Sequence, residues 1–267
     1  MKHAETEIER LTAALHGAEG MLQRFSRKLL NVEEKANGDP VTEADLAVDA
    51  YLREALLRPG EGWLSEETRD DLDRLRCRCV WVVDPLDGTK EFIAGIPEWC
   101  VSVGWVVDGA AAAGGICNPA TSETLIGGPR PAPMLGQQQA RVSQRDSLDG
   151  AVVLASRSEL RRGDWEIFRP ARFEIRPTGS IAYKLARVAA GRADATVSLA
   201  PKHEWDIAAG VALVQSARGM VTDLDGEQIR FNRPVPWVNG LIAAGPSLHA
   251  LLLTLVREAR AQGKQGV

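Results

Sequence analysis

The chain is organised around residues 81–92, which read WVVDPLDGTKEF. The apolar run at residues 80–83 predicts a buried strand, because β-branched and aromatic side chains suit a pleated surface. Pro85 cannot donate a ladder hydrogen bond, so we expect this strand to stop at Asp84. A tight loop that holds two carboxylates, a glycine and a hydroxyl follows at once. Polar chemistry is therefore expected at the end of a buried strand.

This loop combines acidic side chains with a backbone suited to anions. Asp84 and Asp87 supply the carboxylates. Gly88 permits a positive φ or a close backbone approach, so that successive N–H groups there can form an anion-binding nest. Carboxylates and an anion share a site comfortably only when a cation lies between them. Mg²⁺ takes oxygen ligands and bridges to phosphate, which makes it the expected ion.

The composition is that of an ordinary globular protein. The 267 residues allow one large or two small domains. The net charge of -4 argues against a general nucleic-acid or membrane-surface binder, so we expect neither a nucleic-acid polymer nor a membrane as partner. We find no secretory signal and no apolar run of the roughly 20 residues that a membrane span needs. With the 4 cysteines expected as thiols, these features predict a cytoplasmic location.

Hydrophobic periodicity predicts an α+β arrangement in the first half of the chain. Residues 4–31 carry apolar side chains at 3-4 spacing, which predicts a helix lying on a sheet. Thr42 and Asp45 resemble a capping pair for a second helix that reaches about Leu57. Residues 63–64 are expected as a short extended piece, and the expected strands of a following antiparallel meander are 99–107, 114–119 and 124–126, with a hairpin turn at Asp108-Gly109.

The second half alternates strands and helices, which predicts an α/β arrangement. Residues 127–149 are rich in Gly, Pro, Gln and Ser. We therefore expect an N-terminal α+β domain at 1–145 that carries the metal-binding loop, and a C-terminal α/β domain at 146–267 that completes the site. The expected strands are 152–154, 195–197, 220–221 and 241–242, and the expected helices run from Ser180 to about Ala190 before Gly191, from Asp206 to Ala217 before Gly219, and onward from a Ser247 cap.

Four acidic residues stand at predicted strand ends or helix starts, namely Glu66, Asp84, Asp87 and Asp206. Two unit charges about 4 Å apart repel by roughly 4 kcal/mol at an effective dielectric near 20. Four carboxylates in one pocket would therefore strongly oppose a folding free energy of about 5–15 kcal/mol. Divalent cations turn this repulsion into attraction, so a shared metal site is the expected reason for the pattern.

Five motifs follow one another in a recognisable order. The two most specific are DPLDGT at 84–89 and WDIAAG at 205–210, and the others are PVTEAD at 40–45, SEE at 65–67 and Gly179-Ser180. Together they resemble the inositol monophosphatase superfamily of Mg²⁺-dependent phosphomonoesterases. The resemblance implies an α/β fold, a layered αβαβα sandwich of the inositol monophosphatase and sugar phosphatase type. It also implies two or three Mg²⁺ ions, inhibition by Li⁺ and often a homodimer.

The resemblance further implies which residues hold the metals. Glu66, Asp84 and the backbone carbonyl of Leu86 would hold the ion that binds the attacking water. Asp84, Asp87 and Asp206 would hold a second ion that steadies the leaving oxygen, so that Asp84 bridges the two. In such a site the ions lower the pKa of bound water and neutralise charge on the transition state.

The same resemblance implies roles around the nucleophile and the phosphate. The Thr89 hydroxyl, with Glu66 or through an Asp45–Thr89 pair, would orient and deprotonate the water. A third, weaker ion would lie near Glu66 and Glu67. Backbone N–H groups of Gly88 and Thr89 would bind the phosphate.

A rival mechanism uses an aspartyl nucleophile. Haloacid-dehalogenase-type phosphatases carry two aspartates that are separated by one residue. Here Leu86 stands where the second aspartate would be, and the next carboxylate is Asp87. This spacing disfavours a phospho-aspartate and favours metal-activated water.

The expected substrate is a small phosphorylated molecule. GTKEF at 88–92 and SRS at 156–158 resemble the bacterial 3′(2′),5′-bisphosphate nucleotidases of the CysQ type, which convert adenosine 3′,5′-bisphosphate to AMP and phosphate in sulfur metabolism. PKHE at 201–204 replaces the segment where inositol phosphatases usually place an acidic inositol-binding residue. A second phosphate needs cationic or N–H partners. The expected substrate contacts are Leu86, Asp87, Gly88, Thr89, Lys90, Arg157, Ser180, Lys184, Lys202 and Asp206.

Two enzymatic alternatives remain within the superfamily, inositol-1-monophosphatase and histidinol-phosphate phosphatase. An alternative of a different class is a protein that binds metal or nucleotide without catalysis. Mg²⁺-dependent release of phosphate separates this last alternative from the enzymes.

Overall fold

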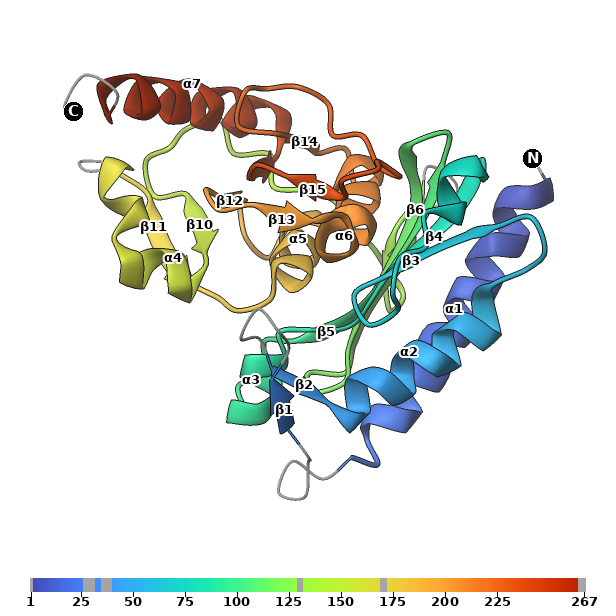
Figure 1. Cartoon of the computed structure of the whole chain (residues 1–267). Coiled ribbons are helices and arrows are strands. Elements are labelled where there is room, and N and C mark those ends of the chain that lie inside the picture. Colours follow the sequence, from blue (N-terminus) through green and yellow to red (C-terminus); the bar gives the residue numbers. More distant parts are fainter. Residues whose placement is uncertain (1, 26–31, 35–39, 129–131, 169–171, 264–267) are drawn as a thin grey trace.

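The computed structural model of the chain has five layers that alternate helices and sheets (Figure 1). Helices α1 (Lys2–Leu22) and α2 (Glu43–Leu56) cover one face of a seven-stranded sheet. Helices α5 (Ile181–Ala189) and α6 (Glu204–Ser216) lie between this sheet and a five-stranded one, and α7 (Pro246–Gly263) covers the far side. This arrangement confirms the predicted αβαβα sandwich. The structure describes residues 2–25, 32–34, 40–128, 132–168 and 172–263.

The first sheet is the predicted antiparallel meander with one parallel pair, β3 with β4, at its edge. The hairpin turn at Asp108-Gly109 is confirmed, with φ of 51° and 75° at its two central residues, as a type I′ turn requires. In spatial order the strands are β3 (Gly62–Ser65), β4 (Cys79–Asp87), β5 (Cys100–Val107), β6 (Ala110–Asn118), β7 (Glu123–Gly127), β8 (Met134–Leu135) and β9 (Gln138–Gln139).

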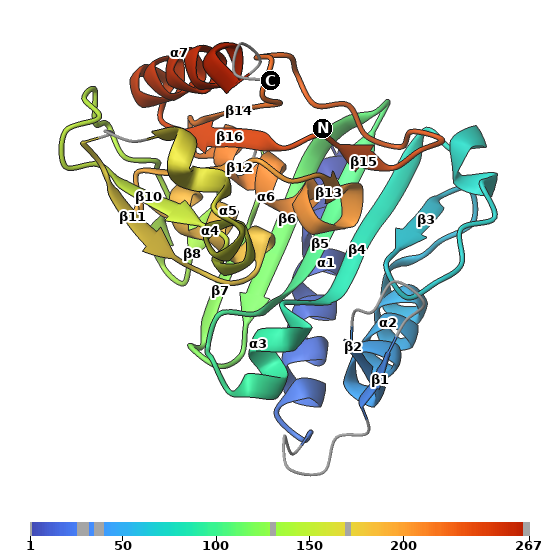
Figure 2. The same cartoon turned by 60° about the vertical axis from the view of Figure 1, so that its left-hand side comes forward.

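The side chains of β4 alternate between the two faces of this sheet. Trp81 and Val83 pack into the hydrophobic cluster that α1 and α2 complete. Val80 and Val82 pack into the cluster formed with α5 and α6. Figure 2 shows α1 behind β5 and β6 and α6 in front of them. Because side chains alternate with a period of two, Asp84 falls on the α6 side of the sheet.

The prediction that this strand stops at Asp84 is wrong. β4 runs through Pro85 to Asp87, with Asp84 opposite Ser102 and Asp87 opposite Cys100. Two residues of β4 therefore face one residue of β5, which is a β-bulge. A proline is tolerated there because the bulge already interrupts the hydrogen-bond ladder.

The second sheet confirms the four strands predicted for the second half. β10 pairs in parallel with β11 and β12, whereas β16 is antiparallel to both of its neighbours. The domain boundary predicted between residues 145 and 146 stays a prediction. In spatial order the strands are β11 (Glu174–Pro177), β10 (Val152–Ala155), β12 (Ala195–Ser198), β16 (Leu241–Ala244) and β14 (Met220–Thr222). The remaining elements are β1 (Val32–Glu34), β2 (Pro40–Thr42), β13 (Lys202–His203), β15 (Trp237–Val238), α3 (Thr89–Ala94), α4 (Arg157–Arg162), η1 (Asp73–Arg76) and η2 (Asp164–Phe168).

The contacts of α6 explain the small residues of its motif. A side chain added at Gly104 of β5 would place its Cβ 2.8 Å from the Cβ of Ala208. A Cβ at Gly210 would lie 2.4 Å from that of Leu185 on α5. Real Cβ atoms do not approach so closely, so α6 touches both the sheet and its neighbouring helix through small residues. The helix is buried between the two sheets, and its start is thereby fixed over the end of β4.

The start of α6 differs from the prediction. The helix begins at Glu204 rather than at Asp206, and His203 is its N-cap residue. Asp206 occupies the third helical position, where its side chain accepts a 2.9 Å hydrogen bond from the His203 backbone N–H. At the other end Arg218 takes the left-handed conformation, with φ of 67°, one residue before Gly219, which was predicted to close the helix.

Two further helix ends were misplaced. α1 ends at Leu22, and turn hydrogen bonds follow it, so the predicted extension to residue 31 is wrong as far as residue 25 and lies outside the described residues beyond that. α7 begins at Pro246, a residue whose fixed φ suits the first helical position, so Ser247 lies within the first turn. No helix among the residues described combines the length and the apolar character needed to cross a membrane.

Candidate active site

Acidic side chains from three elements meet at the end of β4. Glu66 directly follows β3, Asp84 lies in β4, and Asp206 lies in the first turn of α6. One carboxylate oxygen of each lies within 4.8 Å of those of the other two. Residues that are far apart in the sequence thus form one group of oxygen ligands, which is the type of donor that Mg²⁺ prefers.

Asp87 lies beside this group and lines the same pocket. Its Oδ2 accepts hydrogen bonds from Ser180 Oγ at 2.6 Å and from the Ala182 backbone N–H at 2.7 Å. The bulge in β4 directs Asp87 toward the start of α5, and Ser180 is the N-cap residue of that helix. Asp87 therefore joins the first sheet to α5, while its Oδ1 takes no part in these two bonds.

Burial and the repulsion of neighbouring carboxylates raise the pKa values of Asp84 and Asp206. Burial, followed by the negative charges of Glu66, Asp87 and Asp206, raises the pKa of Asp84 well above its usual range. Burial, followed by the charges of Asp87 and Glu66, does the same to the pKa of Asp206. Negative charge in this site is thus unfavourable for the protein alone. A divalent cation among these oxygens would remove that penalty, so the group fits Mg²⁺.

Thr89 sits between the bulge and α2. Its Oγ1 lies 3.1 Å from Oδ1 of Asp45 and 3.1 Å from the carbonyl oxygen of Leu86. The other oxygen of Asp45 accepts hydrogen bonds from the backbone N–H of Thr42 at 2.8 Å and from its hydroxyl at 2.5 Å. Asp45 therefore caps α2 with one oxygen and contacts Thr89 with the other, and burial raises its pKa.

Gly88 forms the turn that brings Thr89 to the site. Its φ is 96°, which a residue with a side chain rarely adopts. A Cβ at this position would also lie 3.0 Å from the Glu98 carbonyl oxygen. Gly88 and Thr89 at the start of α3 consequently line the same pocket as the carboxylates.

A pocket of about 1010 Å³ contains the acidic group. Asp45 and Glu67 do not line it: Asp45 is buried under Thr89, and Glu67 follows Glu66 in the loop after β3. The other predicted contacts that line the pocket are Leu86, Asp87, Gly88, Thr89, Lys90, Arg157, Ser180, Lys184 and Lys202.

Arg157 is held in the pocket by acidic partners, whereas Nζ of Lys184 donates to the Thr178 carbonyl oxygen at 3.3 Å. Arg157 forms an ion pair with Glu98 and lies 3.6 Å from Oε1 of Glu91. Glu98 also accepts a 2.7 Å hydrogen bond from the Gly179 backbone N–H. Burial and the positive charge of Lys202 lower the pKa of Lys184 to about 8.

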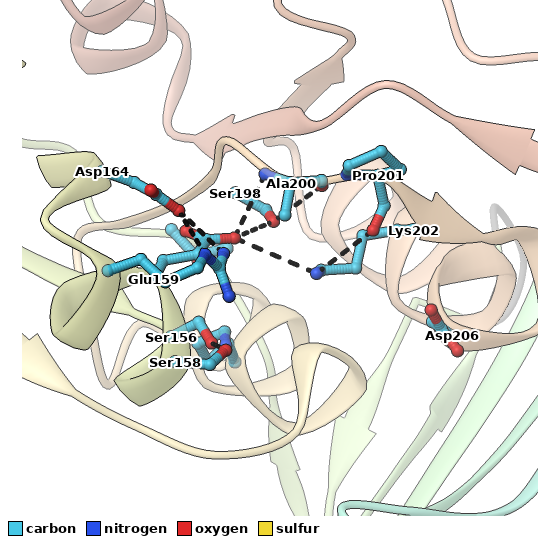
Figure 3. A network of polar contacts seen from close by, with 12 residues as sticks. Ser156, Ser158, Glu159, Asp164, Ser198, Ala200, Pro201, Lys202 and Asp206 are labelled. Carbon is cyan, nitrogen blue, oxygen red and sulfur yellow. Dashed lines mark hydrogen bonds and ion pairs between the residues drawn. The ribbon is translucent and has the colours of Figure 1, made fainter. Parts of the chain in front are cut away.

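Lys202 reaches the pocket from the start of β13, directly after a loop that is held by a buried carboxylate (Figure 3). Its Nζ lies 3.3 Å from the Pro201 carbonyl oxygen and 3.9 Å from Oε1 of Glu159. Glu159 accepts hydrogen bonds from Ser198 Oγ at 2.7 Å and from the Ala200 N–H at 3.2 Å. Burial would raise the pKa of Glu159, but these bonds and the charge of Lys202 leave it lowered.

Three carboxylates around the pocket were not predicted from the sequence, namely Asp49, Glu98 and Glu159. Each holds a loop in place. Asp49 follows Asp45 by one helical turn, so the pattern of α2 could have indicated it. Glu98 and Glu159 carry no comparable signal, because their partners lie far away in the sequence.

Comparisons with known proteins agree with this site. A family model described as "Inositol monophosphatase family" matches residues 3–261. An inositol-1-monophosphatase from Mesorhizobium japonicum is 36% identical over 225 residues, covering 81% of this chain and 82% of that protein. A fructose-1,6-bisphosphatase/inositol-1-monophosphatase from Thermotoga maritima is 34% identical over 218 residues, covering 79% and 83%.

A solved structure of an IMPase has the same fold as this chain. The IMPase of Thermotoga maritima aligns with a TM-score of 0.80 and 28% identity, covering 98% of this chain and 99% of that one. The fold, the acidic group and these matches agree with one another. The chain belongs to the inositol monophosphatase family, whose members are metal-dependent phosphatases.

Proposed function

We propose that the protein is a Mg²⁺-dependent phosphomonoesterase that acts on a small molecule carrying a second anionic group, with adenosine 3′,5′-bisphosphate as the expected substrate. The observation that carries this proposal is the lining of the pocket around the acidic group. Five cationic side chains line it, namely Lys90, Arg157, Arg161, Lys184 and Lys202. A single phosphate bound through metal and backbone N–H groups does not need five cationic side chains. A second phosphate on the substrate does need cationic partners of its own.

Glu66, Asp84, Asp87 and Asp206 would hold the Mg²⁺ ions, together with the Leu86 carbonyl. Bound there, Mg²⁺ supplies an activated water and neutralises charge on the phosphate. Asp84 is the central residue of this group, since it is 1% exposed and the negative charges of the other three carboxylates all raise its pKa.

Thr89 and Asp45 would accept the proton of the attacking water. The Thr89 hydroxyl can donate to the Asp45 carboxylate at 3.1 Å, which leaves its oxygen lone pairs able to accept from water. Because burial raises the pKa of Asp45, this carboxylate is a better proton acceptor than an exposed one. Backbone N–H groups of Gly88 and Thr89 would hold the phosphate in line with the water.

Lys202 is the cationic side chain best placed to receive the second anionic group. It belongs to the β13 segment next to Asp206, and its ammonium group is in loose contact with Glu159 at 3.9 Å. The neighbouring acidic residue Glu204 does not line the pocket, because its carboxylate accepts backbone hydrogen bonds from Asn232 and Arg233. This wall of the pocket therefore favours an anion over the hydroxyl groups of a polyol.

Inositol-1-phosphate is the second candidate substrate, and the names of the relatives favour it. The relative from Mesorhizobium japonicum is named for inositol-1-phosphate hydrolysis, and that from Thermotoga maritima for both a bisphosphate and an inositol phosphate.

The test compares kcat/KM for adenosine 3′,5′-bisphosphate, inositol-1-phosphate, histidinol phosphate and fructose 1,6-bisphosphate in the presence of Mg²⁺. The wild type should prefer the first. Lys202→Met should lower kcat/KM for it by about 10- to 100-fold, in line with about 1.5–3 kcal/mol for a charged hydrogen bond, whereas Lys202→Arg should retain most of it. A wild-type preference for inositol-1-phosphate would assign the protein to the second candidate.

A further inference from the structure

Asp49 is a buried acidic residue of α2 that has no part in the chemistry described above. It is 7% exposed. Its Oδ1 accepts a 2.5 Å hydrogen bond from Ser65 Oγ, and its Oδ2 accepts a 2.6 Å hydrogen bond from Thr68 Oγ1. Both oxygens are therefore used to hold the loop that follows β3.

This loop carries Glu66 between its two points of attachment. Ser65 is the last residue of β3, and the Glu66 backbone N–H donates a 3.2 Å hydrogen bond to the Val83 carbonyl oxygen of β4. The Ser65 hydroxyl additionally accepts a 3.4 Å hydrogen bond from the Glu67 N–H. With Asp49 holding the hydroxyls on both sides, the backbone at Glu66 has little freedom to turn.

α2 connects this loop with the one that carries Thr89. Asp45 and Asp49 are one helical turn apart, and residues at i and i+4 lie on the same face of a helix. Asp45 contacts Thr89 and Asp49 contacts the loop of Glu66. One helix face thus fixes the spacing between the proposed proton acceptor and one of the proposed metal ligands.

We propose that Asp49 is a positioning residue that holds Glu66 toward Asp84 and thereby sets the affinity of the site for Mg²⁺. The inference rests on the proposed role of Glu66 as a metal ligand. Asp49 accepts hydrogen bonds from the hydroxyls of Ser65 and Thr68. In its absence water could accept these bonds, but water is mobile and would not fix the loop. Residues that orient metal ligands typically change metal affinity or activity by about 10- to 100-fold when they are removed.

The experiment measures how Asp49→Ala changes the Mg²⁺ concentration that gives half of the full effect. Two readouts are used on the whole protein: phosphate release, and the rise in melting temperature that Mg²⁺ causes in the absence of substrate. Both midpoints should rise by about 10- to 100-fold, with KM for substrate at saturating Mg²⁺ little changed. Asp49→Asn keeps an acceptor oxygen and should recover much of the affinity. Glu54→Gln, which removes a charge from the exposed side of α2, should leave both midpoints unchanged.

A merely structural Asp49 would lower the melting temperature without moving the Mg²⁺ midpoint, and that result would overturn the inference. If Asp49→Ala does not fold, Thr68→Val removes one of the two donors and should still raise the midpoint several-fold, and an unchanged midpoint there has the same meaning. Glu66→Gln separates the two proposals. An unaltered Mg²⁺ response in Glu66→Gln contradicts the proposed ligand itself, whereas a response lost in Glu66→Gln but unaltered in Asp49→Ala contradicts only the role of Asp49.

Discussion

Replacing Asp84 with Asn should stabilise the metal-free protein while abolishing its activity. The carboxylate oxygens of Asp84, Glu66 and Asp206 lie within 4.8 Å of one another, at which distance two full charges repel by about 3.5 kcal/mol at an effective dielectric near 20. The neutral amide would remove two such pairs, which is about 7 kcal/mol on the same scale if all three groups were fully charged. Protonation already relieves much of this repulsion, because the pKa of Asp84 is raised. We therefore expect a net gain of about 2 kcal/mol, or about 4–8 °C in melting temperature.

The assay is thermal unfolding with a chelator and with saturating Mg²⁺, accompanied by phosphate release. In the wild type, Mg²⁺ should raise the melting temperature strongly, whereas in Asp84→Asn it should have little effect. The chelated wild type should also lose stability as the pH rises from about 4 toward neutrality, since a carboxyl group whose pKa is raised on folding binds its proton more tightly in the folded state. The variant should show less of this loss.

Asp146→Asn is the matched control, because it makes the same chemical change at an exposed position outside the pocket. It should leave stability, Mg²⁺ response and activity unchanged. An Asp84→Asn variant that is less stable than the wild type in chelator, and is still stabilised by Mg²⁺ to the same extent, would contradict a metal site centred on Asp84. Near-normal phosphate release by the variant would likewise remove Asp84 from the centre of the site.

Three other predictions concern separate parts of the molecule. Burial lowers the pKa of His249 below its usual 6.5, so the folded state should lose up to about 1.4 kcal/mol per pH unit below pH 6.5, and His249→Gln should lack this part of the loss in denaturant titrations. Gly210→Ala should lower the free energy of unfolding by about 1–3 kcal/mol, because its Cβ would lie 2.4 Å from that of Leu185. Thr89→Val should lower kcat by about 10²- to 10⁴-fold, measured at saturating Mg²⁺, because Asp45 would lose its link to the water.

Two of these predictions have a control variant in the same chain. Gly20→Ala adds a methyl group to α1, where nothing lies within 4 Å, so it should stabilise by about 0.5–1 kcal/mol. A similar gain in Gly210→Ala would contradict close packing between α5 and α6. Thr89→Ser keeps the hydroxyl and should retain most of kcat. Equal losses in the serine and valine variants would show that the hydroxyl is not what matters. An unchanged pH profile in His249→Gln would mean that the pKa of this imidazole does not differ between the folded and the unfolded protein.

Much of the fold follows from local patterns. The apolar run from Val80 to Val83 predicted a buried strand, and all four of these residues are buried in β4. The Thr42–Asp45 capping pair and the Asp108-Gly109 turn depend on neighbouring residues only, and both were predicted. These features can be predicted because the interactions that cause them are between residues that lie within a few positions of one another in the sequence.

Features that depend on distant residues were not predictable in the same way. The bulge at Pro85 requires the register of β5, which the sequence of β4 does not contain. The capping interaction between His203 and Asp206 moved the start of α6 by two residues, because a histidine is an unusual N-cap residue. The network around Glu159 joins α4 to the loop before α6, so only the folded chain brings its members together.

The hydrogen bonds from Ser180 and Ala182 to Asp87 have a consequence for the synthesis and folding of the protein. They join Asp87 of β4, which is synthesised early, to the start of α5, which is synthesised later. A nascent or truncated polypeptide that lacks α5 and α6 carries the DPLDGT loop but neither its partners nor Asp206. Such a fragment should be inert toward the cell's phosphate esters, and two inactive fragments that reassemble should regain turnover together. Phosphatase activity therefore requires that β4, α5 and α6 have all been synthesised and have folded together.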